Sequence, residues 1–354
     1  MEEKTTIKKI DRNTKSYHVD MFLERTVQHI DSNSKLVFDD KGMGYYYDQL
    51  LIATGGKPRR LKMDNPDVIY YRTMEDYEKV LEMSKKHKSF CVIGGGFIGA
   101  EMAAALCMNK NQVTMIFPEK GTCGTMFPES LSNFLTNYYR EKGVKILTGD
   151  SVIDIQKVES EMVVMTKAEN RLVFDCVIAG IGLLPNIELA EIVGIPVQNG
   201  IIIDEHGHTA VPNIFAAGDV ANFECKPLGK RVRVEHEDNA NTMGQIIGRN
   251  MAGALEEYNH LPSFYSDMFD LGYEAVGEIN PNLEVYMDWV TEFKEGVIYF
   301  LENRKVRGVL LWNVWEQLES ARNLIRENKT IENLDELKNK IQNEEPELLD
   351  KELY

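Results

Sequence analysis

The chain has 354 residues, 43% of them apolar, a length that suggests two or three domains with a substantial buried core. Its formal net charge of -16 repels phosphate backbones and anionic membrane surfaces, so nucleic-acid binding is disfavoured. Five widely spaced cysteines and seven histidines form no metal-ligand pattern, so we predict no metal site.

Hydrophobic periodicity predicts strands alternating with helices along most of the chain. The predicted elements up to residue 181 are short strands over 11–38, a strand over 47–56, a helix over 73–87, a strand over 90–93, a helix over 97–108, a strand over 113–117, a helix over 129–142, a strand over 144–147, a β-rich stretch over 151–175 and a strand over 176–181. Beyond these we expect a strand over 213–217, a helix over 237–254, a separate β-rich domain from about residue 261 with strands over 273–279, 284–290, 296–301 and 306–312, and a short helix with an acidic tail over 329–354. No apolar run approaches the roughly 18 residues of a membrane-spanning helix, and the first residues do not read as a signal or transit peptide.

The segment Gly94-Gly95-Gly96-Phe97-Ile98-Gly99 matches the G-x-G-x-x-G pattern between a predicted strand and a predicted helix. Glycines there permit a tight turn and the close approach of a pyrophosphate, which the helix N-terminus then binds. Glu119 follows the next strand, where such units place a carboxylate on the ribose hydroxyls. This carboxylate favours NAD over NADP because it would repel a 2′-phosphate. The alternative is a purely structural glycine turn.

Several separated segments resemble known flavoproteins. The Ala53-Thr54-Gly55 turn, the G-x-G-x-x-G-x-E pattern ending at Glu101 and the Gly218-Asp219 strand end are typical of proteins that bind two dinucleotides. The segments similar to the apoptosis-inducing factor family are Phe117–Gly121, Pro128–Asn133, Val234–His236, Gly272–Gly277 and Leu311–Asn313. This resemblance runs from about residue 17 to 335 and implies membership of the wider group of ferredoxin-reductase-like pyridine nucleotide oxidoreductases.

The resemblance implies an α/β fold of two interleaved Rossmann-like dinucleotide-binding domains, an FAD module with an inserted NAD module, plus a C-terminal α+β domain. The expected boundaries are 1–60 with 180–260 for a partial FAD-binding domain, 61–179 for the inserted NADH-binding domain, 261–335 for the C-terminal domain and 336–354 for the acidic tail. Members of the family begin with a glycine-loop unit for FAD, so we expect an N-terminally truncated chain that starts after that unit. The family's long C-terminal insertion is missing between Val290 and Gly296.

Position by position, the resemblance implies two sets of cofactor contacts. The FAD set is Val27, Arg59, Asp219, His236 and Tyr265. The NAD set is Gly95, Gly96, Phe97, Ile98, Glu119, Gly182, Glu235, Glu274 and Asn313, with His236 shared. Phe97, Glu101 and His236 are the expected catalytic residues, with Phe97 behind the nicotinamide and Glu101 tuning the flavin potential. Tyr265 replaces the tryptophan typical of the family, and Thr125 replaces a basic residue.

The implied function is an NADH-dependent oxidoreductase that passes hydride from NADH to FAD. One alternative is an NADH-sensing binding and assembly protein with slow or no turnover. A disulfide reductase is disfavoured because the chain has no paired cysteines, and an acidic ferredoxin acceptor is disfavoured by the net negative charge. The resemblance also implies a mitochondrial location, a homodimer and a protein-import or assembly partner.

Overall fold

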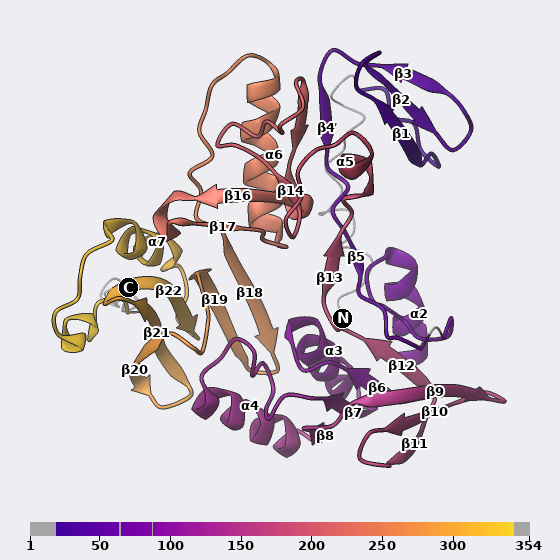
Figure 1. Cartoon of the computed structure of the whole chain (residues 1–354). Coiled ribbons are helices and arrows are strands. Elements are labelled where there is room, and N and C mark those ends of the chain that lie inside the picture. Colours follow the sequence, from indigo (N-terminus) through magenta and orange to yellow (C-terminus); the bar gives the residue numbers. More distant parts are fainter. Residues whose placement is uncertain (1–18, 64, 87, 343–354) are drawn as a thin grey trace, which may run out of the picture.

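The computed structural model describes residues 19–63, 65–86 and 88–342, and Figure 1 shows how their elements are arranged. The strands expected over 11–18 and the tail beyond 342 lie outside these residues. We use three names for parts of the chain: the two-part region (residues 19–60 and 180–260), the inserted region (61–179) and the C-terminal region (261–342).

A parallel four-stranded sheet forms the centre of the inserted region, in the order β12-β6-β7-β8. Its strands are β6 (Ser89–Ile93), β7 (Gln112–Phe117), β8 (Lys145–Thr148) and β12 (Cys176–Ala179). Its helices are α2 (Met74–Ser84), α3 (Phe97–Met108) and α4 (Glu129–Glu141). An antiparallel sheet of β9 (Val152–Val158), β10 (Glu161–Thr166) and β11 (Arg171–Phe174) flanks them. Helix α3 is apolar on nearly all sides, and it packs on both β7 and the C-terminal strand β18.

The two-part region consists of short strands and two helices. The strands are β1 (Val27–Asp31), β2 (Leu36–Asp39), β3 (Gly44–Tyr46), β4 (Leu50–Ile52), β5 (Gly56–Pro58), β13 (Leu183–Pro185), β14 (Ile201–Ile202), β15 (Ile214–Ala216), β16 (Ala221–Cys225) and β17 (Lys230–Val232). The helices are α5 (Glu188–Ile192) and α6 (Glu237–Met251). The two connections to the inserted region run side by side as the antiparallel pair β5–β13.

The segment 47–56 is predicted to be a buried strand that ends in a glycine turn, and β4 covers only Leu50–Ile52 of it. After it, the Thr54 hydroxyl donates to the Asn186 carbonyl and the Asn186 amide donates back to the Thr54 carbonyl. These side-chain bonds hold the backbone in a turn instead of a strand ladder.

The C-terminal region is an antiparallel five-stranded sheet in the order β18-β19-β22-β21-β20. Its strands are β18 (Ser263–Met268), β19 (Leu271–Gly277), β20 (Glu284–Thr291), β21 (Glu295–Glu302) and β22 (Lys305–Trp312), followed by α7 (Leu318–Glu327) and the short 3-10 helix η4 (Leu334–Leu337). The sequence patterns did not predict β18 or α7. Polar residues interrupt β18, and one of them, Ser266, is buried only because α3 covers it.

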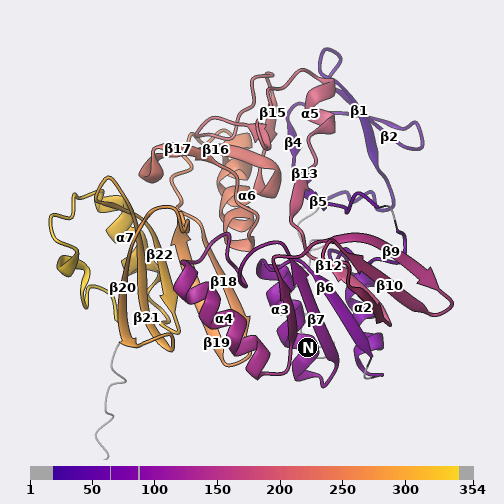
Figure 2. The same cartoon turned by 60° about the horizontal axis from the view of Figure 1, so that its bottom comes forward.

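The two faces of the C-terminal sheet belong to different hydrophobic clusters. On β21, Val297 and Tyr299 join a cluster shared with α7 and the two-part region, whereas Ile298 and Phe300 join one shared with α3 and α4. This alternation follows from the two-residue period of a strand. In Figure 2 the sheet accordingly lies beside α4, with α7 behind it.

Candidate functional site

The glycine loop leaves an open backbone cradle at the start of α3. A Cβ on Gly94 would lie 2.3 Å from the Gly180 carbonyl oxygen, and one on Gly95 would lie 2.7 Å from the Phe117 ring. A Cβ on Gly96, the residue before α3, would meet nothing within 4 Å. Close packing therefore requires the first two glycines, while the third leaves free space beside the helix N-terminus, where an anion is stabilised.

Glu119 follows β7 and lines a pocket of about 370 Å³. The other lining residues come from the loop after β7, from the start of α4 and from the C-terminal residues Pro281 and Asn282. Cys123 in the same loop donates its backbone N–H to the Gly95 carbonyl oxygen at 2.7 Å. The loop that follows Glu119 is therefore hydrogen-bonded to the glycine loop.

Aromatic side chains from three parts of the chain meet at the start of α3. The Phe97 ring lies 5.2 Å from the Phe264 ring of β18 and 6.1 Å from the Tyr273 ring of β19, measured between centroids. His236, at the N-terminus of α6, lies 6.5 Å from Phe264 and 5.3 Å from Tyr265. Phe264 thus lies between the two predicted catalytic residues Phe97 and His236, and flat apolar surfaces of this kind suit planar cofactor rings.

Glu101 is a mostly buried carboxylate one turn into α3. The Ser266 hydroxyl donates a hydrogen bond to it at 2.5 Å. Burial raises the pKa of Glu101, and the nearby Asp267 adds to the effect, while the Ser266 hydrogen bond lowers it less. A buried carboxyl group of this kind, bonded to the strand that carries Phe264, is typical of a functional site.

His236 caps α6, and its Nδ1 accepts a hydrogen bond from the Asp238 backbone N–H at 3.4 Å. Burial lowers the pKa of His236, although the charges of Asp238, Glu237 and Asp219 raise it by a smaller amount. The neutral imidazole is therefore favoured near neutral pH, and its Nδ1 is assigned as an acceptor.

Glu274 and Tyr265 lie opposite each other on β19 and β18. The Tyr265 side chain is exposed, whereas one oxygen of the Glu274 carboxylate is buried and has no hydrogen-bond partner among the described residues. Burial raises the pKa of Glu274. A buried acceptor without a donor costs free energy in the folded chain, so a bound ligand with a donor group would be stabilised here.

Asp219 belongs to the short 3-10 helix η2 (Gly218–Val220) and contacts an arginine from the inserted region. The Arg72 guanidinium lies 3.4 Å from the Asp219 carboxylate, and it would lie 3.6 Å from a Cβ on Gly55. Arg72 therefore connects two of the motifs on which the flavoprotein resemblance rests. Sequence reasoning missed Arg72, because no local pattern singles out an arginine before a helix.

The remaining predicted residues have varied surroundings. The Arg59 backbone N–H donates to the Gly182 carbonyl at 2.9 Å, and Gly182 itself has open space around its Cα. Glu235 forms an ion pair with Arg233 at 2.5 Å. The Asn313 side chain accepts from the Gly272 N–H and donates to the Lys294 carbonyl, so it is already bound to the backbone.

Two predicted positions, Val27 and Ile98, are exposed or partly exposed. Val27 begins β1 and is exposed, and Figures 1 and 2 both show the β1–β3 sheet well separated from α3. Ile98 is partly exposed in the first turn of α3, and its side chain packs 3.2 Å from where a Cβ on Gly180 would lie.

Sequence reasoning also missed Phe264, Ser266 and Tyr273. Phe264 and Ser266 are two residues apart on β18, so a strand assignment there would have placed them on one face. Their contact with Phe97 and Glu101, more than 160 residues earlier, has no local signal.

Within the described residues, no helix is long and apolar enough to cross a membrane. The same residues contain no group of three or more His, Cys, Asp or Glu side chains placed to hold a metal ion, and their five cysteines are unpaired.

Comparison with known proteins gives a consistent result. The family described as pyridine nucleotide-disulphide oxidoreductase matches residues 2–244, and the C-terminal domain of mitochondrion-associated apoptosis-inducing factor matches residues 284–327. The chain is 34% identical over 338 residues to "Apoptosis-inducing factor 1, mitochondrial" of Dictyostelium discoideum, which covers 88% of this chain and 63% of that protein. It is 31% identical over 338 residues to monodehydroascorbate reductase 3 of Arabidopsis thaliana, covering 90% and 77%.

Among solved structures, the covalent putidaredoxin reductase–putidaredoxin complex superposes with a TM-score of 0.81 at 29% identity, over 87% of this chain and 76% of that one. The fold is therefore the two Rossmann-like domains and C-terminal domain that the sequence predicted. The chain spans less than two-thirds of the length of the Dictyostelium relative. It belongs to the pyridine nucleotide-disulphide oxidoreductase family, whose cofactors are FAD and NAD(H), and within that family it is of the apoptosis-inducing-factor type.

Proposed function

We propose that this chain binds NADH and promotes the transfer of a hydride from NADH to FAD, as part of an apoptosis-inducing-factor-like oxidoreductase. The observation that carries the proposal is the start of α3. There, the open backbone cradle at Gly96 directly precedes Phe97, whose ring contacts Phe264, and Glu101 follows one turn later. One helix therefore joins an anion site to a buried aromatic and carboxylate cluster.

In the proposed site, bound NADH would supply a hydride and bound FAD would accept it, so no side chain need act as a general base. The backbone of Gly95, Gly96 and Ile98 holds the pyrophosphate, and Glu119 accepts from the ribose hydroxyls. Phe97 limits the orientation of the nicotinamide, a contribution that acts on the rate of transfer more than on affinity. Gly182, Glu235, Glu274 and Asn313 complete the NAD site.

The proposed FAD contacts come from the two-part region and from β18. Asp219 accepts hydrogen bonds from the sugar hydroxyls of FAD. Arg72, which pairs with Asp219, is proposed to bind the FAD phosphates through its positive charge. His236 and Tyr265 border the ring system, and Val27 and Arg59 complete the set. Ser266 holds the Glu101 carboxylate in one orientation, so that its charge acts on the redox pocket from a fixed place.

The names of the relatives favour this redox function over the assembly alternative. The Arabidopsis relative is a reductase, and the solved complex pairs a reductase with putidaredoxin. By the same resemblance we propose the boundaries given above for the three domains, a mitochondrial location and a homodimer. The net charge of -16 favours an acceptor other than an acidic iron–sulfur protein.

A cofactor titration tests the proposal. We expect the purified chain to bind NADH more tightly than NADPH by calorimetry, by roughly tenfold or more, because a hydrogen bond to a charged group contributes about 1.5–3 kcal/mol. Glu119→Ala should reduce this preference. Glu129→Ala is the matched control. Glu129 lines the same pocket but begins helix α4, whereas the carboxylate that binds the ribose in this fold follows the second strand.

Equal affinity for the two nucleotides in the unmodified chain would refute the role of Glu119. Reduction of protein-bound FAD by NADH in an anaerobic stopped-flow experiment would establish the hydride transfer. Tight NADH binding to flavin-loaded protein without any flavin reduction would support the assembly alternative instead.

A further inference from the structure

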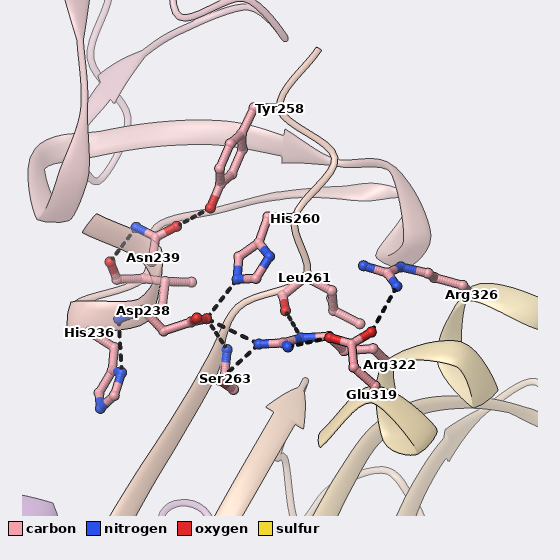
Figure 3. Close-up of polar contacts among 11 residues, drawn as sticks. His236, Asp238, Asn239, Tyr258, His260, Leu261, Ser263, Glu319, Arg322 and Arg326 are labelled. Atoms are coloured by element: carbon pink, nitrogen blue, oxygen red, sulfur yellow. Dashed lines mark hydrogen bonds and ion pairs between the residues drawn. The ribbon is translucent and has the colours of Figure 1, made fainter. Parts of the chain in front are cut away.

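A partly buried network of charged side chains connects α6, β18 and α7, outside the glycine loop and the aromatic cluster (Figure 3). Its centre is the Oδ2 atom of Asp238. This oxygen accepts from the Ser263 backbone N–H at 2.9 Å, lies 2.7 Å from His260 Nε2, and lies 3.3 Å from Arg322 Nη2. Two other segments, residues 260–263 and α7, therefore converge on one carboxylate oxygen of α6.

Arg322 connects α7 to this network. Its side chain is only 9% exposed. Besides Asp238, its guanidinium donates to the Leu261 carbonyl and the Ser263 hydroxyl, each at 3.0 Å, and to Glu319 at 2.6 Å. A buried guanidinium with its donors satisfied in this way is held in one orientation.

The network lies next to the proposed redox residues in sequence and in space. Asp238 is two residues after His236, and its N–H donates to the His236 ring. Ser263, which Asp238 binds, directly precedes Phe264 and Tyr265, the two rings that contact His236. The Asp238–Ser263 hydrogen bond thus joins the two chain segments whose side chains meet at His236.

We propose that Asp238 and Arg322 are positioning residues that hold the His236 ring against Phe264 and Tyr265. Neither side chain is among the proposed cofactor contacts; both act through the backbone of α6 and β18. The role rests on the proposed function, because the position of His236 matters for hydride transfer only if His236 borders the flavin.

Electrostatics support a fixed, charged Asp238. Burial alone would raise the pKa of Asp238, but the hydrogen bonds from His260 and Ser263 and the charges of His260 and Arg322 lower it to about 2. The carboxylate is therefore ionised at any physiological pH. A second set of hydrogen bonds lies beside Asp238 and connects α6 to the residues on either side of it. The Tyr258 hydroxyl donates to Asn239 at 2.8 Å, and the Asn239 amide donates to the Val234 carbonyl at 3.0 Å.

A first experiment needs no cofactor. In protein labelled selectively at histidine and tyrosine, an NMR cross-relaxation signal between the His236 and Tyr265 rings should be observed, and His236→Gln and Tyr265→Phe assign it. We expect Asp238→Asn and Arg322→Lys to abolish the signal or reduce it at least about threefold. Arg326→Gln is the control, because Arg326 lies one turn further along α7 and contacts Glu319 but not Asp238.

A residue that only stabilised the fold would lower the melting temperature and leave the ring contact in the folded protein unchanged. An unchanged signal in both Asp238→Asn and Arg322→Lys would therefore overturn the proposal. If Arg322→Lys does not fold, Asp238→Asn alone decides, since asparagine preserves the side-chain volume but loses the charge that binds His260 and Arg322 and holds the carboxylate at Ser263.

A second experiment separates this proposal from the proposed function. In flavin-loaded protein, we expect Asp238→Asn to slow anaerobic flavin reduction about tenfold or more, with less than about a threefold change in the Kd of NADH, because misorientation lowers the rate of transfer more than it weakens binding. Loss of the ring contact with an unchanged reduction rate would show that Asp238 positions His236 but that His236 is not in the redox site. In that case the assignment of His236 to the redox site fails, whereas the hydride transfer and the structural role of Asp238 stand. Absence of flavin reduction in the unmodified chain would instead refute the proposed function.

Discussion

Adjacent glycines in the loop before α3 have different physical roles. Gly95 packs against the Phe117 ring, where a Cβ would come within 2.7 Å, whereas Gly96 faces open space and has φ -81° and ψ -166°, values that any residue tolerates. Gly95 is therefore required for packing, whereas the space beside Gly96 is open to a ligand.

This difference leads to a paired test. We expect Gly95→Ala to destabilise the chain by about 1–3 kcal/mol, the usual cost of overpacking, as measured by urea unfolding. Gly96→Ala should leave the unfolding free energy nearly unchanged but weaken NADH binding about tenfold or more, because its methyl group would occupy the space needed for close backbone approach. Two variants with the same stability and the same affinity would contradict this division of roles.

Glu101 shows how function can cost stability. Burial raises its pKa, so the folded chain binds a proton at Glu101 more tightly than the unfolded chain does. The stabilising contribution is then present at low pH and is lost as pH rises through the raised pKa. Above the raised pKa, the charge of Glu101 therefore lowers the stability of the fold.

We therefore expect Glu101→Gln to raise the melting temperature at pH 7, with the advantage over the unmodified chain shrinking as pH falls toward about 4. Ser266 can still donate to the amide oxygen, so the packing is preserved. Circular dichroism at several pH values measures the effect. A variant less stable than the unmodified chain at pH 7 would show that the charge is better compensated than we infer.

At the scale of elements, the start of α2 positions Arg72. The Thr73 hydroxyl accepts from the Asp76 N–H, and the Asp76 carboxylate accepts from the N–H groups of Thr73 and Arg72. This reciprocal capping box satisfies backbone donors at the helix N-terminus. It also fixes the backbone from which Arg72 reaches Asp219 in the other region.

Removing the cap should therefore weaken both helix α2 and the Arg72–Asp219 contact. We expect Thr73→Ala to cost about 0.5–2 kcal/mol of unfolding free energy, whereas Thr73→Ser should cost much less because its hydroxyl can make the same bond. Urea unfolding followed by circular dichroism gives both values. Equal losses in the two variants would indicate that the methyl group of Thr73, rather than its hydroxyl, supports the helix.

At the scale of the whole molecule, the C-terminal sheet joins the other two regions. Its strands alternate between the two hydrophobic clusters: Leu311 of β22 packs with the two-part region and Trp312 packs with α3 and α4. The charged network around Asp238 adds a polar connection at the edge of this interface. The three regions should therefore unfold together rather than one by one.

Acid unfolding tests that connection. Because the pKa of Asp238 is lowered to about 2 from an ordinary value of 3.8, its contribution to stability is present above about pH 4 and is lost as pH falls toward 2. We expect Asp238→Asn to lower the melting temperature at pH 7 and to converge with the unmodified chain near pH 2. The control is Asp270→Asn, because Asp270 makes an exposed pair with Lys142 and should show little effect.

Local patterns determined much of this protein. Helix α3 begins and ends at the residues that periodicity predicted, and β6 and β7 differ from prediction by a single residue at one end. The family and the fold class followed from short motifs, because glycine loops and strand ends carry their signals within a few consecutive residues. The identities of the proposed site residues, Glu119 and His236 among them, rested on the same motifs and stay predictions.

Only the tertiary structure showed which of these residues meet. Phe264 between Phe97 and His236, Ser266 on Glu101, and Arg322 on Asp238 are contacts between segments far apart in the chain, and no periodicity records them. The strand β18 was not predicted for the same reason. Its Ser266 is buried by helix α3, whose Glu101 lies 165 residues earlier, and a distant partner of this kind decides whether a polar side chain is buried.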